Sequence, residues 1–61
     1  MNKQQLKQYA MITAYMDNGM AGAAALGLSA MVRAAMSAKS RAALMAAAVD
    51  LGLTNHPDFI V

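Results

Sequence analysis

The chain has 61 residues, no cysteine and a single histidine. This length allows one domain, which we expect to span residues 1–61, and the composition excludes disulfides and a zinc site. Hydrophobic residues make up 59% of the chain and charged residues 13%, which is too apolar for a disordered protein. The net charge of +2 comes from five basic and three acidic residues. That is too few basic residues for the clustered patch of a dedicated nucleic-acid binder.

Neither a membrane-spanning segment nor a secretory signal is expected. The longest uncharged run, residues 18–32, is interrupted by three glycines and is shorter than the roughly 20 apolar residues of a span. The start MNKQQLKQ followed by YAMITAYM is similar to the basic and apolar parts of a signal, but Asp17, Asn18 and Gly19 follow at once. We therefore expect a cytoplasmic protein.

Residues 2–16 are predicted to form an amphipathic helix with Asn2 as its N-cap. One face has apolar side chains at helical spacing. Met11 and Tyr15 lie on the opposite face, among Gln4, Lys7 and other polar side chains. Two interpretations stay open for this pair: scattered surface residues that need no explanation, or a second contact surface. The residues of the core face are Leu6, Tyr9, Ile12, Thr13 and Met16.

A short helix of small residues is expected over residues 20–26. Asn18 and Gly19 tolerate the left-handed conformation that ends the first helix. Gly27 has the position just past the end of a helix, and Ser29 has the position of the next N-cap.

Residues 29–51 contain no glycine or proline and are rich in alanine, the best helix former. The alternatives are one helix over this range, or a break near residues 37–40 with Ser40 as a cap. Lys39 and Arg41 would oppose the dipole at the start of a new helix. A heptad series also continues through the serines, so we favour the single helix. The series consists of Leu28, Met31, Ala35, Ala38, Ala42, Met45 and Val49.

The last ten residues are predicted to leave the helix and to fold back. Gly52 is a suitable C-cap, with Leu53 placed to contact the helix that it ends. Pro57 disfavours helix at the residue before it, so residues 54–58 form a turn. The apolar residues 59–61 are then expected to pack against the helices or against a partner.

These elements predict an all-α fold: a small helical bundle or hairpin with an N-terminal helix, a short Ala/Gly helix and a long or broken C-terminal helix. Alanine recurs every four residues from Ala30 to Ala46, and small side chains allow helices to approach closely. Residues 42–51 are apolar almost all round, with Asp50 as their one charge, which is typical of a buried helix. In so short a chain, burial on all faces predicts a homo-oligomer or a larger protein partner. The expected interface residues are Met11, Tyr15, Met31, Leu44, Met45, Leu51 and Phe59.

Residues 22–36, GAAALGLSAMVRAAM, have a small helix, a glycine turn and a serine that opens a second helix. Up to Leu28 this segment resembles the helix-turn-helix of bacterial and phage regulators, with Ala23 and Gly27 at the small-residue and turn positions. The family expects a buried aliphatic residue where this chain has Arg33. The resemblance implies contacts to phosphates or base edges, and the alternative is the solvated face of an amphipathic helix. The implied nucleic-acid contacts are Arg33, Ser37, Lys39 and Arg41.

The sequence contains no pattern typical of an active site. Asp17, Asp50 and Asp58 lie in or beside separate turns, and His56 precedes a proline. There is no phosphate-binding loop, no spacing typical of metal ligands and no sign of a cofactor. We therefore expect a non-enzymatic protein that self-associates or that binds and modulates a larger protein. The alternative is a small DNA-binding regulator.

Overall fold

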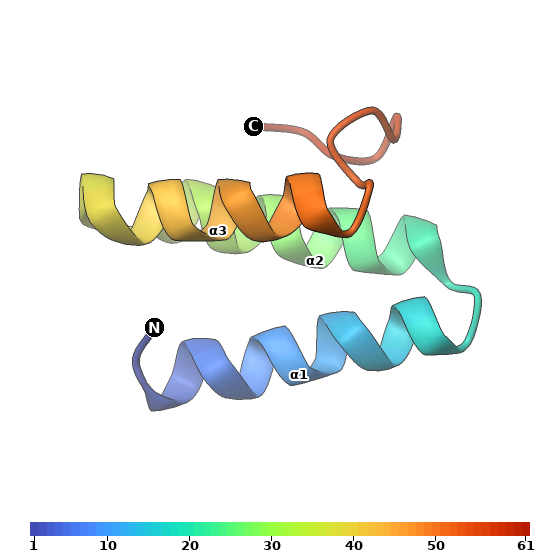
Figure 1. The fold of residues 1–61 in the computed structure, drawn as a ribbon, viewed down its shortest axis with the longest axis horizontal. Coiled ribbons are helices and arrows are strands. Elements are labelled where there is room, and N and C mark those ends of the chain that lie inside the picture. The colour runs from blue at the N-terminus through green and yellow to red at the C-terminus, as the bar shows by residue number, and fades with distance from the viewer.

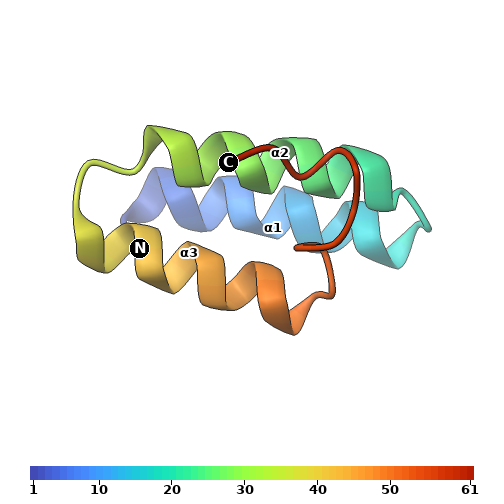
Figure 2. The same cartoon turned by 90° about the horizontal axis from the view of Figure 1, so that it is seen from above.

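The computed structural model describes residues 1–61 and contains three helices and no strand. They are α1 (Lys3–Asp17), α2 (Ala21–Ala34) and α3 (Ala38–Asp50). Successive helices run in opposite directions, and the last residues of the chain cross over α2 (Figures 1 and 2). The predicted all-α class and the small helical bundle are confirmed.

Helix α1 begins and ends where the sequence predicts. The Asn2 side chain accepts a hydrogen bond from Gln5 N at 2.8 Å, and the Gln5 side chain accepts one from Asn2 N at 3.0 Å. This reciprocal pair satisfies two amide groups that the helix itself leaves free. Beyond the other end, Gly19 has a φ of +70°, which glycine adopts without steric strain.

The predicted helix end at Gly27 is wrong, because α2 continues through Gly27 and Ser29 to Ala34. Ser29 caps nothing, since its hydroxyl donates to the Leu26 carbonyl within the same helix at 3.0 Å. Gly27 is the point where α1 comes close to α2. A Cβ atom on it would lie 2.5 Å from Cδ1 of Ile12, so the glycine permits close helix packing and makes no turn.

The predicted single helix over residues 29–51 is also wrong. The chain leaves α2 at Ala35, which has a ψ of 128°, and Ser37 caps α3 by accepting a hydrogen bond from Ser40 N at 3.0 Å. Arg41 is tolerated in the first turn because its Nη2 donates to the Ala35 carbonyl at 3.1 Å. The corner between the helices therefore satisfies its own polar groups, and α3 is free to fold back onto α2.

Helix α2 is the centre of the bundle and packs against both other helices. No Cα atom of α1 lies within 8 Å of a Cα atom of α3. Leu6, expected on the core face of α1, is exposed because no part of α3 comes near enough to cover it. Phe59 packs against the core, whereas Ile60 and Val61 are exposed, so the predicted docking of the tail is confirmed for Phe59 only. The buried apolar residues are Ile12, Ala24, Ala25, Leu28, Met31, Val32, Ala35, Leu44, Ala48 and Leu53.

Helix α3 is covered on one side only. Leu44 and Ala48 are buried, whereas Ala42, Ala46 and Val49 are exposed. The break after α2 also divides the heptad series, so its residues do not form one continuous surface. The accessible surface of 3971 Å² is close to the roughly 3,800 Å² expected for a folded monomer of this mass. The fold is therefore completed within one chain.

The close approach of α1 and α2 predicts that Gly27→Ala destabilises the protein. Overpacking against Ile12 costs about 1–3 kcal/mol, and the gain in helix propensity is only about 1 kcal/mol. We expect the free energy of unfolding, measured by urea denaturation, to fall by about 1 kcal/mol. In an Ile12→Val background, which lacks Cδ1, the same change should raise it by up to about 1 kcal/mol. Equal effects in both backgrounds would contradict this role of Ile12.

The cap of α3 predicts that Ser37→Ala lowers the free energy of unfolding by about 1 kcal/mol. The substitution removes the acceptor for the Ser40 amide, which then lacks a partner in the first turn. Ser40→Ala is the matched control, because the Ser40 hydroxyl makes no hydrogen bond in the fold and alanine favours helix. Thermal unfolding followed by circular dichroism measures both. A loss in Ser40→Ala as large as that in Ser37→Ala would rule out Ser37 as the cap.

Candidate interaction surface

An apolar groove runs between α1 and α2 on the surface of the molecule, with a volume of about 440 Å³. Its wall on α1 carries Met11 and Tyr15, and its wall on α2 consists of small residues. Met11 is 55% exposed, although a methionine gains free energy when its apolar surface is buried. The groove is lined by Gln8, Met11, Ile12, Tyr15, Gly27, Ala30, Met31 and Ala34.

The groove continues into a second hollow of about 510 Å³, where the start of α1 lies near the corner between α2 and α3. The two hollows share Gln8, Met31 and Ala34. Here the lining is mostly polar, and Met36 at its edge is 98% exposed. The surface therefore changes from apolar at its middle to polar at one end. The polar residues of this hollow are Asn2, Gln4, Gln5, Gln8, Ser37 and Ser40.

The structure brings together three of the expected interface residues. Met11, Tyr15 and Met31 all line the apolar groove. The other four lie elsewhere: Leu44 is 0% exposed in the core of the single chain, and three more are half-buried against that core. Those three are Met45, Leu51 and Phe59.

Sequence reasoning did not identify Gln8, Gly27, Ala30 and Ala34 as residues of the same groove. Ala30 and Ala34 belong to the four-residue alanine spacing, which was the available signal. Gly27 was missed because its place next to Leu28 resembled a turn. Its role depends on contact with Ile12 of another helix, which the local sequence does not reveal.

The residues expected to contact nucleic acid are partly engaged within the chain. Arg33 donates from Nη1 to the Ile60 carbonyl at 2.7 Å, and Arg41 donates to the Ala35 carbonyl. Ser37 is the cap of α3, while Lys39 is exposed and has no partner. Because α2 continues through Gly27 and runs antiparallel to α3, the turn and the crossing of a helix-turn-helix are absent.

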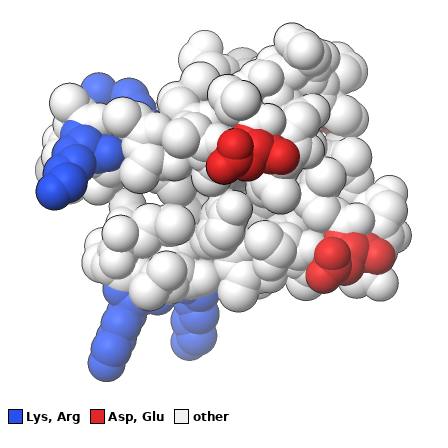
Figure 3. Space-filling model, in the orientation of Figure 1, with Lys and Arg blue, Asp and Glu red and all other residues white.

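Basic and acidic side chains gather at opposite ends of the molecule, which the linear sequence conceals. Figure 3 shows Lys and Arg toward the left of the bundle and acidic side chains at its centre and right. The antiparallel course places the start of α1, the end of α2 and the start of α3 together. The basic end carries Lys3, Lys7, Arg33, Lys39 and Arg41, and the acidic end carries Asp17, Asp50 and Asp58.

None of these basic side chains pairs with a carboxylate in the chain. The single contact within 4.0 Å between a basic residue and a carboxylate joins His56 and Asp58. Lys3 and Lys39 lie at helix starts, and Asp17 and Asp50 end their helices. All four oppose the helix dipoles, so this arrangement does not stabilise α1 or α3.

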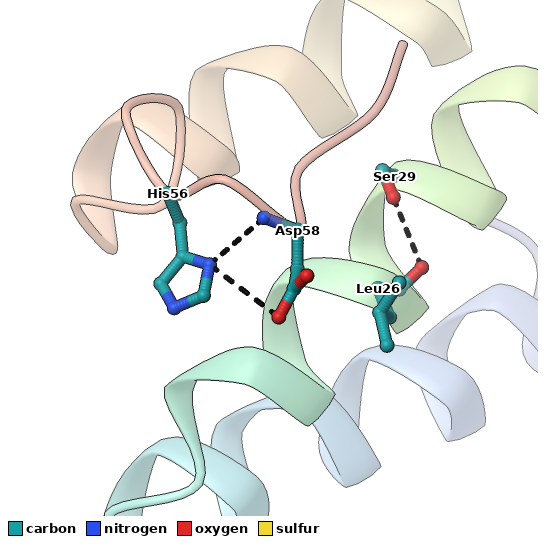
Figure 4. Close-up of polar contacts among 4 residues, drawn as sticks. All are labelled: Leu26, Ser29, His56 and Asp58. Carbon is teal, nitrogen blue, oxygen red and sulfur yellow. Dashed lines mark hydrogen bonds and ion pairs between the residues drawn. The ribbon is translucent and has the colours of Figure 1, made fainter.

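The tail holds the one polar cluster outside the helix ends (Figure 4). The Asp58 amide donates to His56 Nδ1 at 3.1 Å, and the Asp58 Oδ2 atom lies 3.9 Å from the same nitrogen. Both residues lie beside Gly22 in the first turn of α2. Ser29 is directed to its own helix and does not approach them (Figure 4). This arrangement orients the tail and presents no activated serine.

The structure shows neither a cluster of metal ligands nor a membrane-spanning helix. No group of three or more His, Cys, Asp or Glu side chains is arranged to hold a metal ion. None of the three helices combines the length and the hydropathy that a membrane span requires.

Comparison with known proteins found no matching family model, no matching curated protein and no matching solved structure.

The bond between Arg33 and the tail predicts that Arg33→Met loosens residues 60 and 61. The loss of a charged donor to the Ile60 carbonyl should speed removal of Val61 by carboxypeptidase roughly fivefold. Lys39→Met is the matched control, because it removes the same charge from the same end of the bundle but breaks no hydrogen bond. Equal rates of digestion in the two variants would mean that Arg33 does not hold the tail.

Proposed function

We propose that this protein is a non-enzymatic helical interaction protein whose α1–α2 groove receives an apolar segment of a protein. The occupant is a second copy of the chain or a larger protein that the chain modulates. The observation that carries this proposal is the exposed Met11, beside the half-buried Tyr15, opposite the small residues of α2. Such a surface gains free energy only when another apolar surface covers it.

The shape of the groove supports a helix as the occupant. The wall formed by Gly27, Ala30 and Ala34 has little side-chain bulk, so another helix can approach α2 closely. Met11 on the facing wall is flexible and can adapt to the contour of a bound helix. An amphipathic helix in an apolar groove is a recurrent mode of protein recognition.

The polar groups of the chain support a function without catalysis. The three carboxylates do not form a cluster, and the His56 Nδ1 atom already accepts the Asp58 amide. General acid–base catalysis requires a base within hydrogen-bond reach of a reacting group. No serine, cysteine or lysine side chain is paired with His56 to act as a nucleophile.

A nucleic-acid partner is the second candidate, and the gathering of five basic residues at one end is the observation that favours it. Against this, Arg33 and Arg41 each donate a hydrogen bond to a backbone carbonyl of the chain. No helix stands out from the bundle to enter a groove of DNA (Figure 1). We therefore place the protein partner first.

Site-specific photocrosslinking in the native host tests the proposed function. A photoreactive residue at position 11 should crosslink to a protein, and excess unlabelled wild-type chain should abolish the adduct by competition. Excess Met11→Glu should not compete, because a carboxylate in the groove opposes apolar burial. Adducts of twice the mass of the chain would identify a second copy as the occupant.

Position 6 supplies the matched control for this experiment. Leu6 is on the same helix and is 53% exposed, against 55% for Met11, but it does not line the groove. No protein adduct at position 11, or equal adducts at both positions, would contradict the proposal. Binding of a DNA duplex that weakens steeply with salt and survives Met11→Glu would favour nucleic acid instead.

A further inference from the structure

We infer that the occupant of the α1–α2 groove is a second copy of this chain, packed antiparallel to the first about a two-fold axis. This inference rests on the proposed function and identifies its partner. Three observations carry it: the shape of the groove, the distribution of charge and the polarity of the groove along its length.

The groove is complementary to itself. A two-fold interface uses the same patch on both copies, so that patch must contain both the projections and the hollows. Met11 is exposed on the α1 wall beside the half-buried Tyr15, and Gly27, Ala30 and Ala34 leave space on the α2 wall. Met11 of each copy can therefore enter the hollow beside α2 of the other. A groove shaped only to receive a different protein needs no such projections.

The charges select the antiparallel orientation. The basic side chains lie toward one end of a molecule 29 Å long, and acidic side chains lie at its centre and toward the other end (Figure 3). Antiparallel copies bring each basic end beside an acidic end, whereas parallel copies bring like charges together. Exposed charges contribute little affinity, but charge complementarity determines orientation and partner choice. The basic residues have no carboxylate partner within the chain. Arg33 and Arg41 each donate to a backbone carbonyl, and the three lysines remain available for this contact.

The change from apolar to polar residues along the groove favours the same antiparallel orientation. The hollow at the basic end is lined by Asn2, Gln4 and Gln5, and an antiparallel second copy places the polar turn around its Asp17 near that hollow. The apolar middle of the groove meets the apolar middle of the other groove. A standard interface takes about 800 Å² from each partner, and each chain exposes 3971 Å² in total. Such an interface would therefore cover about a fifth of the surface of each chain.

Sedimentation equilibrium over a range of concentrations up to millimolar tests the inference. We expect a monomer–dimer equilibrium, and Met11→Glu should raise its dissociation constant about a hundredfold. The substitution is present in both copies of a two-fold dimer, and each copy contributes a factor of about ten. Leu6→Glu, a charge at an equally exposed position of α1, should leave the dissociation constant unchanged. Circular dichroism should show both variants folded, because the fold is complete in one chain.

Charge exchange tests the orientation. Asp17→Lys alone, and Lys3→Glu with Lys7→Glu alone, should each weaken association, because each makes the facing ends alike in charge. An equimolar mixture of the two variants should associate as strongly as wild type. Both variants improve the match to the dipole of α1, so weaker association does not come from loss of the helix. Asp17→Lys without effect would overturn the antiparallel arrangement.

The remaining outcomes separate this inference from the proposed function. A monomer at every concentration would overturn the second copy as the occupant. If position 11 then still crosslinks to a different protein in the host, the proposed function stands without this inference. If Met11→Glu and Leu6→Glu weaken association equally, the copies associate through another face and the inference is overturned.

Discussion

The structure depends on the close approach of α1 to α2 at Gly27. Ile12 lies against this residue, and a Cβ atom there would force the Cδ1 atom of Ile12 to move. Because α1 lies so near to α2, its outer residues Met11 and Tyr15 are held beside Ala30 and Ala34. The groove is thus a consequence of one packing contact in a small core, which explains why a buried contact and an exposed surface are linked in this chain.

The second constraint is the antiparallel course of three short helices. It brings basic residues that are spread along the sequence toward one end of the bundle and acidic residues toward the other. Lys3, Lys39, Asp17 and Asp50 each oppose the dipole of their own helix. The arrangement therefore does not stabilise these helices. In the dimer that we propose, the same arrangement would place each basic end beside an acidic end.

Two features that local sequence patterns predicted wrongly share one cause. Gly27 before Leu28 is typical of a helix end, yet α2 continues because the glycine allows contact with Ile12. The alanine-rich run from residue 29 favours one long helix, yet packing of α3 on α2 outweighs propensity. The corner is stabilised by Ser37 and by the bond from Arg41 to the Ala35 carbonyl. In both cases a contact between distant residues decided what a helix-forming or turn-forming residue does.

The sequence by itself determined the helical class, the start and end of α1, and the apolar character of Met11 and Tyr15, because capping, propensity and helical periodicity act over a few residues. It also predicted that the tail packs, because the residues after the turn are apolar. Only the tertiary structure decided which apolar residues share a groove, that Leu44 is buried while Leu6 is exposed, and that the charges separate. Those properties depend on which helix faces lie against each other, and this is decided by contacts between residues that are far apart in the sequence.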